Sequence, residues 1–99
     1  MKNEDFLKYK KKLLDIIKKK LPNSDVYLFG SRATKTNYTG SDIDIAIDDK
    51  EKIDPRIILD LYNQIEETTI PFMVDLVDIN NISKSLKDRI KKEAIKWEI

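Results

Sequence analysis

Two aspartates one residue apart are the side chains of this sequence best suited to chemistry. Asp42 and Asp44 belong to the run D-I-D-I-A-I-D, which alternates strictly between polar or small residues and isoleucine. Because residues two apart on a strand project from the same face, the two carboxylates are expected side by side. Like charges that close repel each other unless a cation lies between them, and hard oxygen ligands suit Mg²⁺ or Mn²⁺. The pair therefore predicts a divalent metal site. An ordinary edge strand with aspartates on its solvent face would give the same pattern.

A third aspartate, Asp75, lies in the middle of the apolar run V-D-L-V. A buried carboxylate at this position would be costly without a partner, so we expect Asp75 to be buried and to share a metal with Asp42 and Asp44. Asp78 is the rival candidate. Since it lies three residues further on and points to the opposite face, we interpret it as a turn or cap residue.

A Gly-Ser pair follows the short apolar run 26–29. Gly30 lets backbone amides approach an anion, Ser31 adds a hydroxyl donor, and Arg32 could hold a phosphate. A helix starting just after this pair would add the donors of its N-terminus. An ordinary turn followed by a surface arginine is the alternative. Neither a G-x-x-x-x-G-K-[ST] loop nor a G-x-G-x-x-G fingerprint is present.

The composition narrows the chemistry that is possible. The chain has 99 residues, 19 Lys and Arg against 18 Asp and Glu, and neither His nor Cys. Thiol nucleophiles, imidazole-based triads and ordinary zinc sites are therefore excluded, which leaves carboxylates, hydroxyls, Lys and Arg. The length predicts a single domain over residues 1–99.

Charge and hydropathy also bear on partners and location. The formal net charge of +1 gives no overall basic surface, and we interpret the lysine-rich stretches as solvated helix faces, so a nucleic-acid partner is not expected. No apolar run approaches the roughly 20 residues of a membrane span, and the N-terminus lacks the apolar core of a signal peptide. These features favour a cytoplasmic protein with no membrane partner.

Periodicity predicts the elements that must position these residues. We expect helices over 4–21, 54–69 and from a Ser83 cap through Leu86, Ile90, Ala94 and Trp97, with strands over 26–29, 42–48 and 72–79. A further short helix could follow Ser31. The expected fold is α+β, a small three-stranded mixed sheet flanked by about four helices.

Taken together, the motifs resemble one known superfamily. Phe29-Gly30-Ser31, Asp42-Ile43-Asp44-Ile45 and Val74-Asp75-Leu76 match the pattern hG[GS]...DhDh...D of the nucleotidyltransferases typified by DNA polymerase beta. The resemblance spans roughly residues 26–79 and implies the nucleotidyltransferase palm fold.

Within that superfamily, "LFGSRA" and "GSDIDIAI" are most similar to the minimal nucleotidyltransferases, the MntA-like antitoxins that are paired with helical HEPN proteins. Many members continue Gly-Ser-Arg-Ala with Arg-Gly or Thr-Gly, whereas this chain has Thr34-Lys35. The resemblance implies a Mg²⁺- or Mn²⁺-dependent adenylyltransferase that moves AMP from ATP to a tyrosine of a HEPN-type toxin and so silences it.

The resemblance also assigns roles to residues. Asp42, Asp44 and Asp75 would be the catalytic metal ligands, while Gly30, Ser31 and Arg32 would bind the phosphates of ATP. Two alternatives stay open. The chain could neutralise a toxin by contact, binding nucleotide without turnover, or it could transfer a nucleotide to a small molecule or an RNA end.

Overall fold

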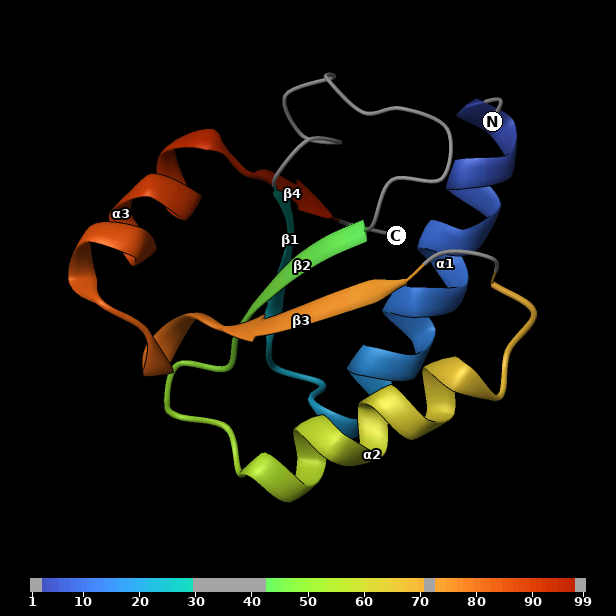
Figure 1. Cartoon of the computed structure of the whole chain (residues 1–99), viewed down its shortest axis with the longest axis horizontal. Helices are drawn as coiled ribbons and strands as arrows, with labels where there is room; N and C mark the ends of the chain where they lie inside the picture. Colours follow the sequence, from blue (N-terminus) through green and yellow to red (C-terminus); the bar gives the residue numbers. More distant parts are fainter. Residues whose placement is uncertain (1–2, 30–42, 71–72, 98–99) are drawn as a thin grey trace.

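The computed structural model describes residues 3–29, 43–70 and 73–97 of the chain. Figure 1 shows the order of the elements: α1 (Asn3–Lys20), β1 (Asp25–Phe29), β2 (Ile43–Asp48), α2 (Pro55–Glu66), β3 (Val74–Asp78), the short 3-10 helix η1 (Ile79–Asn81), α3 (Lys84–Glu93) and β4 (Ile95–Trp97). The predicted α+β class and its mixed sheet are confirmed.

The four described strands form one sheet in the order β3-β2-β1-β4. β1 pairs antiparallel with both β2 and β4, whereas β2 and β3 are parallel. The D-x-D strand is therefore internal, with a hydrogen-bonded neighbour on each side. The alternative that this motif belongs to an edge strand is wrong, because β3 occupies the edge beyond β2.

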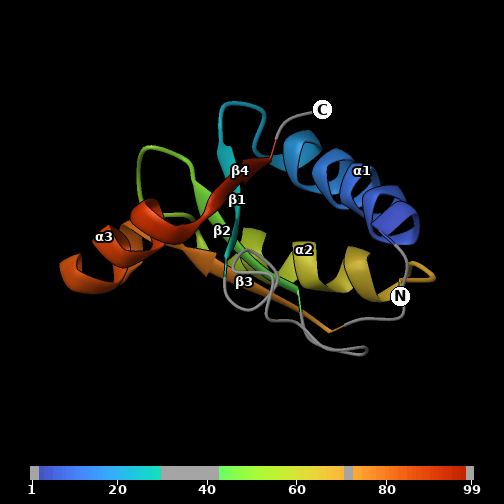
Figure 2. The same ribbon diagram turned by 90° about the horizontal axis from the view of Figure 1, so that it is seen from above.

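Alternating side chains give the sheet one deeply buried face. The three isoleucines of β2 are 0% exposed and pack in the main core, which α1 and α2 cover. The two helices pack against each other, as Figures 1 and 2 show. On the opposite face Ala46 lies with Ile79 and Ile90 in a smaller cluster, so α3 covers that part of the sheet. None of the helices in the described residues is long and apolar enough to cross a bilayer.

Caps fix the starts of α2 and α3 as the sequence predicts. The Asp54 carboxylate accepts the amide of Arg56 at 2.9 Å, and Pro55 is the first residue of α2. The Ser83 hydroxyl accepts the amide of Leu86 at 3.3 Å and caps α3. Each cap satisfies a helix amide that has no partner within its own helix.

The C-terminal part of the prediction is wrong. The last helix was expected to include Trp97, but α3 ends at Glu93, and Ala94 is extended with a ψ of 154°. The chain then forms a fourth strand in which Trp97 pairs with Val26. The physical reason is burial: pairing along β1 turns the indole into the main core, where it is 4% exposed. Helical spacing alone cannot distinguish this arrangement from a continued helix.

The helix count also differs from the prediction of about four. The described residues contain three α-helices and one 3-10 helix. The helix considered after Ser31 lies outside the described residues.

Candidate active site

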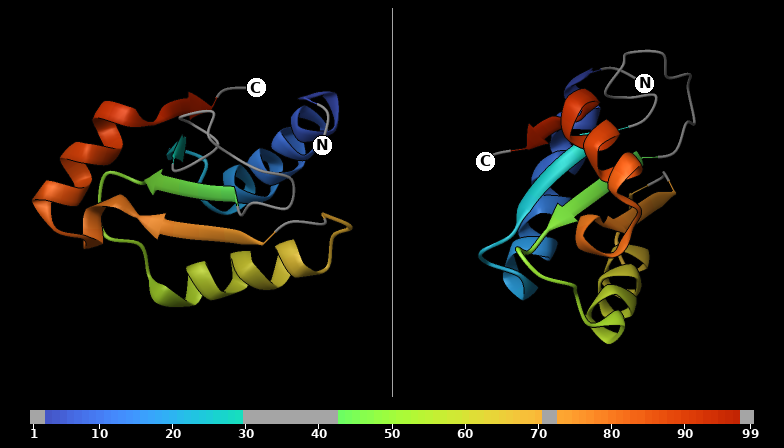
Figure 3. Two further views of the ribbon diagram at one scale, coloured as in Figure 1. Left: turned by 45° about the horizontal axis from the view of Figure 1, so that its top comes forward. Right: turned by 90° about the vertical axis from the view of Figure 1, so that its left-hand side faces the viewer.

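Asp44 and Asp75 occupy directly opposite positions on neighbouring strands. The parallel register of β2 and β3 pairs the two residues, and the left panel of Figure 3 shows these strands side by side and pointing the same way. Register partners project from the same face of a sheet, and adjacent strands are about 4.8 Å apart. On its other side Asp44 pairs with Phe29, the last residue of β1. The sheet thus brings together two of the three predicted carboxylates.

The exposure of Asp75 corrects the prediction. It was expected to be a buried charge, but its side chain is exposed, while Asp44 is half-buried. The reason is topological, because β3 is an edge strand and Asp75 lies on the face opposite the main core, to which Val74 and Leu76 contribute. An exposed carboxylate needs no partner for its own stability, so burial no longer argues for a metal at this position.

The remaining predicted site residues lie outside the described residues. This applies to Asp42, Gly30, Ser31 and Arg32, and to Thr34 and Lys35 as well. Within the described residues no group of three or more His, Cys, Asp or Glu side chains is arranged to hold a metal ion. The part that Asp42, Gly30, Ser31 and Arg32 play in the site stays a prediction from the sequence pattern.

Tyr62 of α2 holds the strand that carries Asp75. Its hydroxyl accepts the Leu76 amide at 2.8 Å and lies 3.5 Å from the Leu76 carbonyl oxygen, to which it can donate. These backbone groups lie on the outer edge of β3, where none of the described strands pairs with them. The sequence reveals Tyr62 only as part of an apolar helix face, because nothing in its spacing shows where the hydroxyl points.

A second anchor holds the C-terminal end of β3. The Asp78 carboxylate accepts the amide of Ile53 at 2.7 Å and the amide of Asn80 at 3.0 Å. The interpretation of Asp78 as a cap residue is therefore confirmed. Since the middle of β3 is tied to α2 and its C-terminal end to the loop before α2, the register of Asp75 against Asp44 is well supported.

Asp48 ends β2 on the same face as Asp44 but has a structural role. Its side chain accepts the Asn80 side-chain amide and the Lys50 backbone amide, each at 2.9 Å. Burial raises the pKa of the Asp48 carboxyl, but these hydrogen bonds together with the charges of Lys50 and Lys91 outweigh it and bring the pKa below the ordinary 3.8. Asp48 is thus an ionised link between the two loops at the far end of the sheet.

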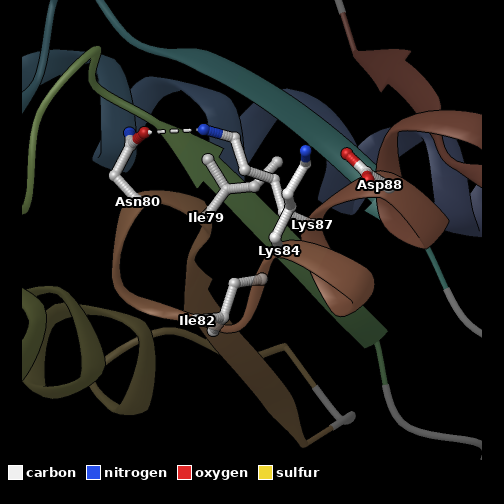
Figure 4. Close-up of a pocket in the computed structure, with 6 residues that line it drawn as sticks. All are labelled: Ile79, Asn80, Ile82, Lys84, Lys87 and Asp88. Carbon is white, nitrogen blue, oxygen red and sulfur yellow. Dashed lines mark hydrogen bonds between the residues drawn. The ribbon is translucent and has the colours of Figure 1, made fainter.

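A pocket of about 370 Å³ lies between η1 and α3 (Figure 4). It is lined by Ile79, Asn80, Ile82, Lys84, Lys87 and Asp88. The ammonium of Lys87 donates to the side-chain oxygen of Asn80 at 3.3 Å, the contact drawn in the figure. At least one lysine of α3 is therefore engaged within the fold. Asp44 and Asp75 do not line this pocket.

A second hollow lies directly beside Asp75, between the end of α2 and the start of β3. This α2–β3 groove has a volume of about 450 Å³. Its lining consists of Tyr62, Ile65, Glu66, Ile70, Met73, Val74 and Asp75. The candidate site therefore has an apolar groove on one side of its exposed carboxylate.

Comparisons with known proteins agree with this arrangement. Residues 11–96 match the family described as polymerase beta, nucleotidyltransferase. No curated protein sequence matches the chain. Among solved structures, the chain is similar to a toxin–antitoxin complex with AMP-PNP, with 26% identity and a TM-score of 0.76 over 91% of this chain and 73% of that one.

Two further solved structures have the same fold. A mutant of the toxin–antitoxin MntA–HpeT is 26% identical, with a TM-score of 0.73, and the match covers 89% of this chain and 70% of that chain. A tri-AMPylated Shewanella oneidensis HEPN toxin in complex with MNT antitoxin gives 24% identity and a TM-score of 0.68, covering 91% of this chain and 70% of that chain.

Proposed function

Because the chain belongs to the polymerase beta nucleotidyltransferase family, as its motifs predicted, we propose that it transfers AMP from ATP to a hydroxyl of a HEPN-type protein partner. The observation that carries this proposal is the register pair of Asp44 and Asp75, two carboxylates on one face at the start of their strands. Such a transfer would make the chain an antitoxin that acts by modification, at work in the cytoplasm where ATP is available.

The solved relatives support the choice of nucleotide and acceptor. A 26% identical toxin–antitoxin complex was solved with AMP-PNP, an analogue of ATP. A complex that shares the fold contains a HEPN toxin that carries three AMP groups. Both observations belong to those proteins, and they make AMP transfer to a HEPN-type protein the most direct proposal for this chain.

The residues of the site fit a divalent ion. Asp44 and Asp75 offer carboxylate oxygens from adjacent positions, one half-buried and one exposed, which is the kind of donor set that Mg²⁺ or Mn²⁺ takes. In the proposal Asp42, Asp44 and Asp75 hold the metal, and Gly30, Ser31 and Arg32 bind the phosphates. A divalent ion bound there would neutralise phosphate charge and orient the reacting oxygens.

The chain's own groups then have simple tasks in the transfer. The acceptor hydroxyl oxygen forms a bond to the α-phosphorus of ATP, and the bond from that phosphorus to the bridging oxygen breaks, so pyrophosphate leaves. The exposed Asp75 carboxylate is accessible to the acceptor and takes its proton. Positioning and charge neutralisation carry such chemistry, which is consistent with a chain that has neither His nor Cys.

The test uses ATP labelled on its α-phosphate. The chain, Mg²⁺ and the HEPN-type protein are incubated together, and we expect the label on a tyrosine of that protein and one pyrophosphate released for each transfer. Chelation by EDTA and the Asp44→Asn substitution should each abolish labelling. ATP binding without pyrophosphate release would instead support an antitoxin that acts by contact. Label on RNA or on a small molecule would contradict the proposed acceptor.

A further inference from the structure

The α2–β3 groove combines an apolar lining with the most exposed large hydrophobic side chain of the described residues. Met73 is 72% exposed at its mouth, and Ile65 and Val74, each 7% exposed, form its buried floor. Exposing this much apolar surface is unfavourable in water, and an apolar side chain entering the groove would cover it. Since Asp75 lines the same groove, anything bound there would lie beside the candidate site.

The walls of the groove are fixed by hydrogen bonds in the free chain. The Tyr62 ring is held through its hydroxyl to the backbone of Leu76. In the turn after α2, the Thr68 hydroxyl donates to the Ile65 carbonyl at 2.6 Å and accepts the Ile70 amide at 3.3 Å. A groove whose walls are already ordered loses little conformational entropy when it binds a partner.

The charges of the groove select among the possible occupants. Its charged lining residues are Glu66 and Asp75, both exposed carboxylates, and neither forms a salt bridge with a described residue. In the proposed site Asp75 is a metal ligand, so Glu66 is the charge of the groove that remains to select an occupant, and its carboxylate attracts Lys or Arg. The complementary ligand is an apolar peptide segment with a basic residue beside it.

We propose that the α2–β3 groove docks the acceptor protein through an apolar segment flanked by Lys or Arg, and thereby brings the acceptor hydroxyl to Asp75. This inference rests on the proposed function for the identity of the acceptor. Met73 serves as an apolar anchor and Glu66 as the charged contact at the rim. Both act by positioning the acceptor and take no part in bond making.

The test compares Met73→Ser with Leu86→Ser. Leu86 is also an exposed large hydrophobic, at 39%, but it lies on α3 and does not line the groove. Binding of the HEPN-type protein is measured by calorimetry. We expect Met73→Ser to raise Kd about tenfold, the loss typical of an interface anchor, and Leu86→Ser to leave Kd unchanged. Glu66→Lys should also weaken binding, and by more at low salt than at high salt, because salt screens surface charge pairs.

The same variants distinguish this inference from the proposed function. Binding needs no chemistry, so a Met73→Ser chain that binds the partner as tightly as the wild type overturns the groove assignment even if AMP is transferred. A wild-type chain that binds through the groove but transfers no label overturns the proposed function alone. If Met73→Ser raises the KM for ATP and leaves that for the acceptor protein unchanged, the groove holds the nucleotide and the inference is wrong.

Discussion

Asp44 and Asp75 are register partners on the parallel strands β2 and β3, and both project from the face opposite the main core. β2 is internal and β3 is an edge, so Asp44 is half-buried while Asp75 is exposed. This difference matters for their tasks. An internal carboxylate is held firmly in place, and an edge carboxylate is accessible to a second molecule.

The exposure of Asp75 predicts that its substitution by Asn costs no stability. Exposed side chains without a structural contact usually change the free energy of unfolding by about 0.5 kcal/mol or less. Urea denaturation of Asp75→Asn should therefore match that of the wild type while AMP transfer is lost. A large loss of stability would show that the carboxylate has a structural partner and would make activity data on this variant uninterpretable.

Tyr62→Phe should destabilise the fold at the edge of β3. The substitution keeps the ring but leaves the Leu76 amide without the hydroxyl that accepts it at 2.8 Å. Leaving a partly buried amide without a partner costs about 1–3 kcal/mol, which urea denaturation would detect. Hydrogen exchange of the Leu76 amide provides a local readout, because it should become much faster. Unchanged exchange would contradict the contact.

The Asp48 carboxylate should make the free energy of unfolding fall as the solution is acidified. Its pKa in the folded chain lies below 3.8 despite burial, because Asn80 and the Lys50 amide donate to the carboxylate. A depressed pKa contributes stability that is present above 3.8 and is lost as the pH falls through the lower, folded value. Asp48→Asn should therefore give a shallower decline of the unfolding free energy below pH 3.8. Asp88→Asn on the exposed face of α3 controls for the loss of one carboxylate.

Trp97→Ala tests the fourth strand. Trp97 is 4% exposed in the main core, and truncating a buried aromatic to Ala costs about 3–5 kcal/mol. Ile95→Ala is the matched control in the same strand, since Ile95 is 45% exposed and should cost about 1 kcal/mol or less. Chemical denaturation of both variants checks the prediction. Equal effects would contradict the pairing of β4 with β1.

The sequence was most informative where a pattern is local. The alternation around Asp44, the Asp54 and Ser83 caps and the apolar face of α2 predicted β2 and the helix starts, because strand period and capping depend on nearby residues. The helical spacing of Trp97 predicts a helix, whereas its actual burial depends on pairing with β1, about seventy residues earlier, which local spacing does not show. Asp75 was expected to be buried for a similar reason, since its exposure follows from the strand order and not from its own strand.

The candidate site, like the fold, was predictable from the sequence only in part. The motif predicted one site from Asp42, Asp44 and Asp75, and the parallel register explains why Asp44 and Asp75, so distant in the sequence, lie side by side. The groove with Met73 and Glu66 had no counterpart in the sequence, because it forms where the end of one element passes the start of another.

The most direct test of the central claim is single-turnover transfer of AMP from α-labelled ATP to the HEPN-type protein by the wild type, Asp44→Asn and Asp75→Asn. Replacing a carboxylate that acts on the reacting atoms should slow transfer about 10²-fold or more in each variant, with ATP binding and folding checked in parallel. Transfer by either variant at the wild-type rate would contradict the account, because this pair of carboxylates would then not carry the reaction.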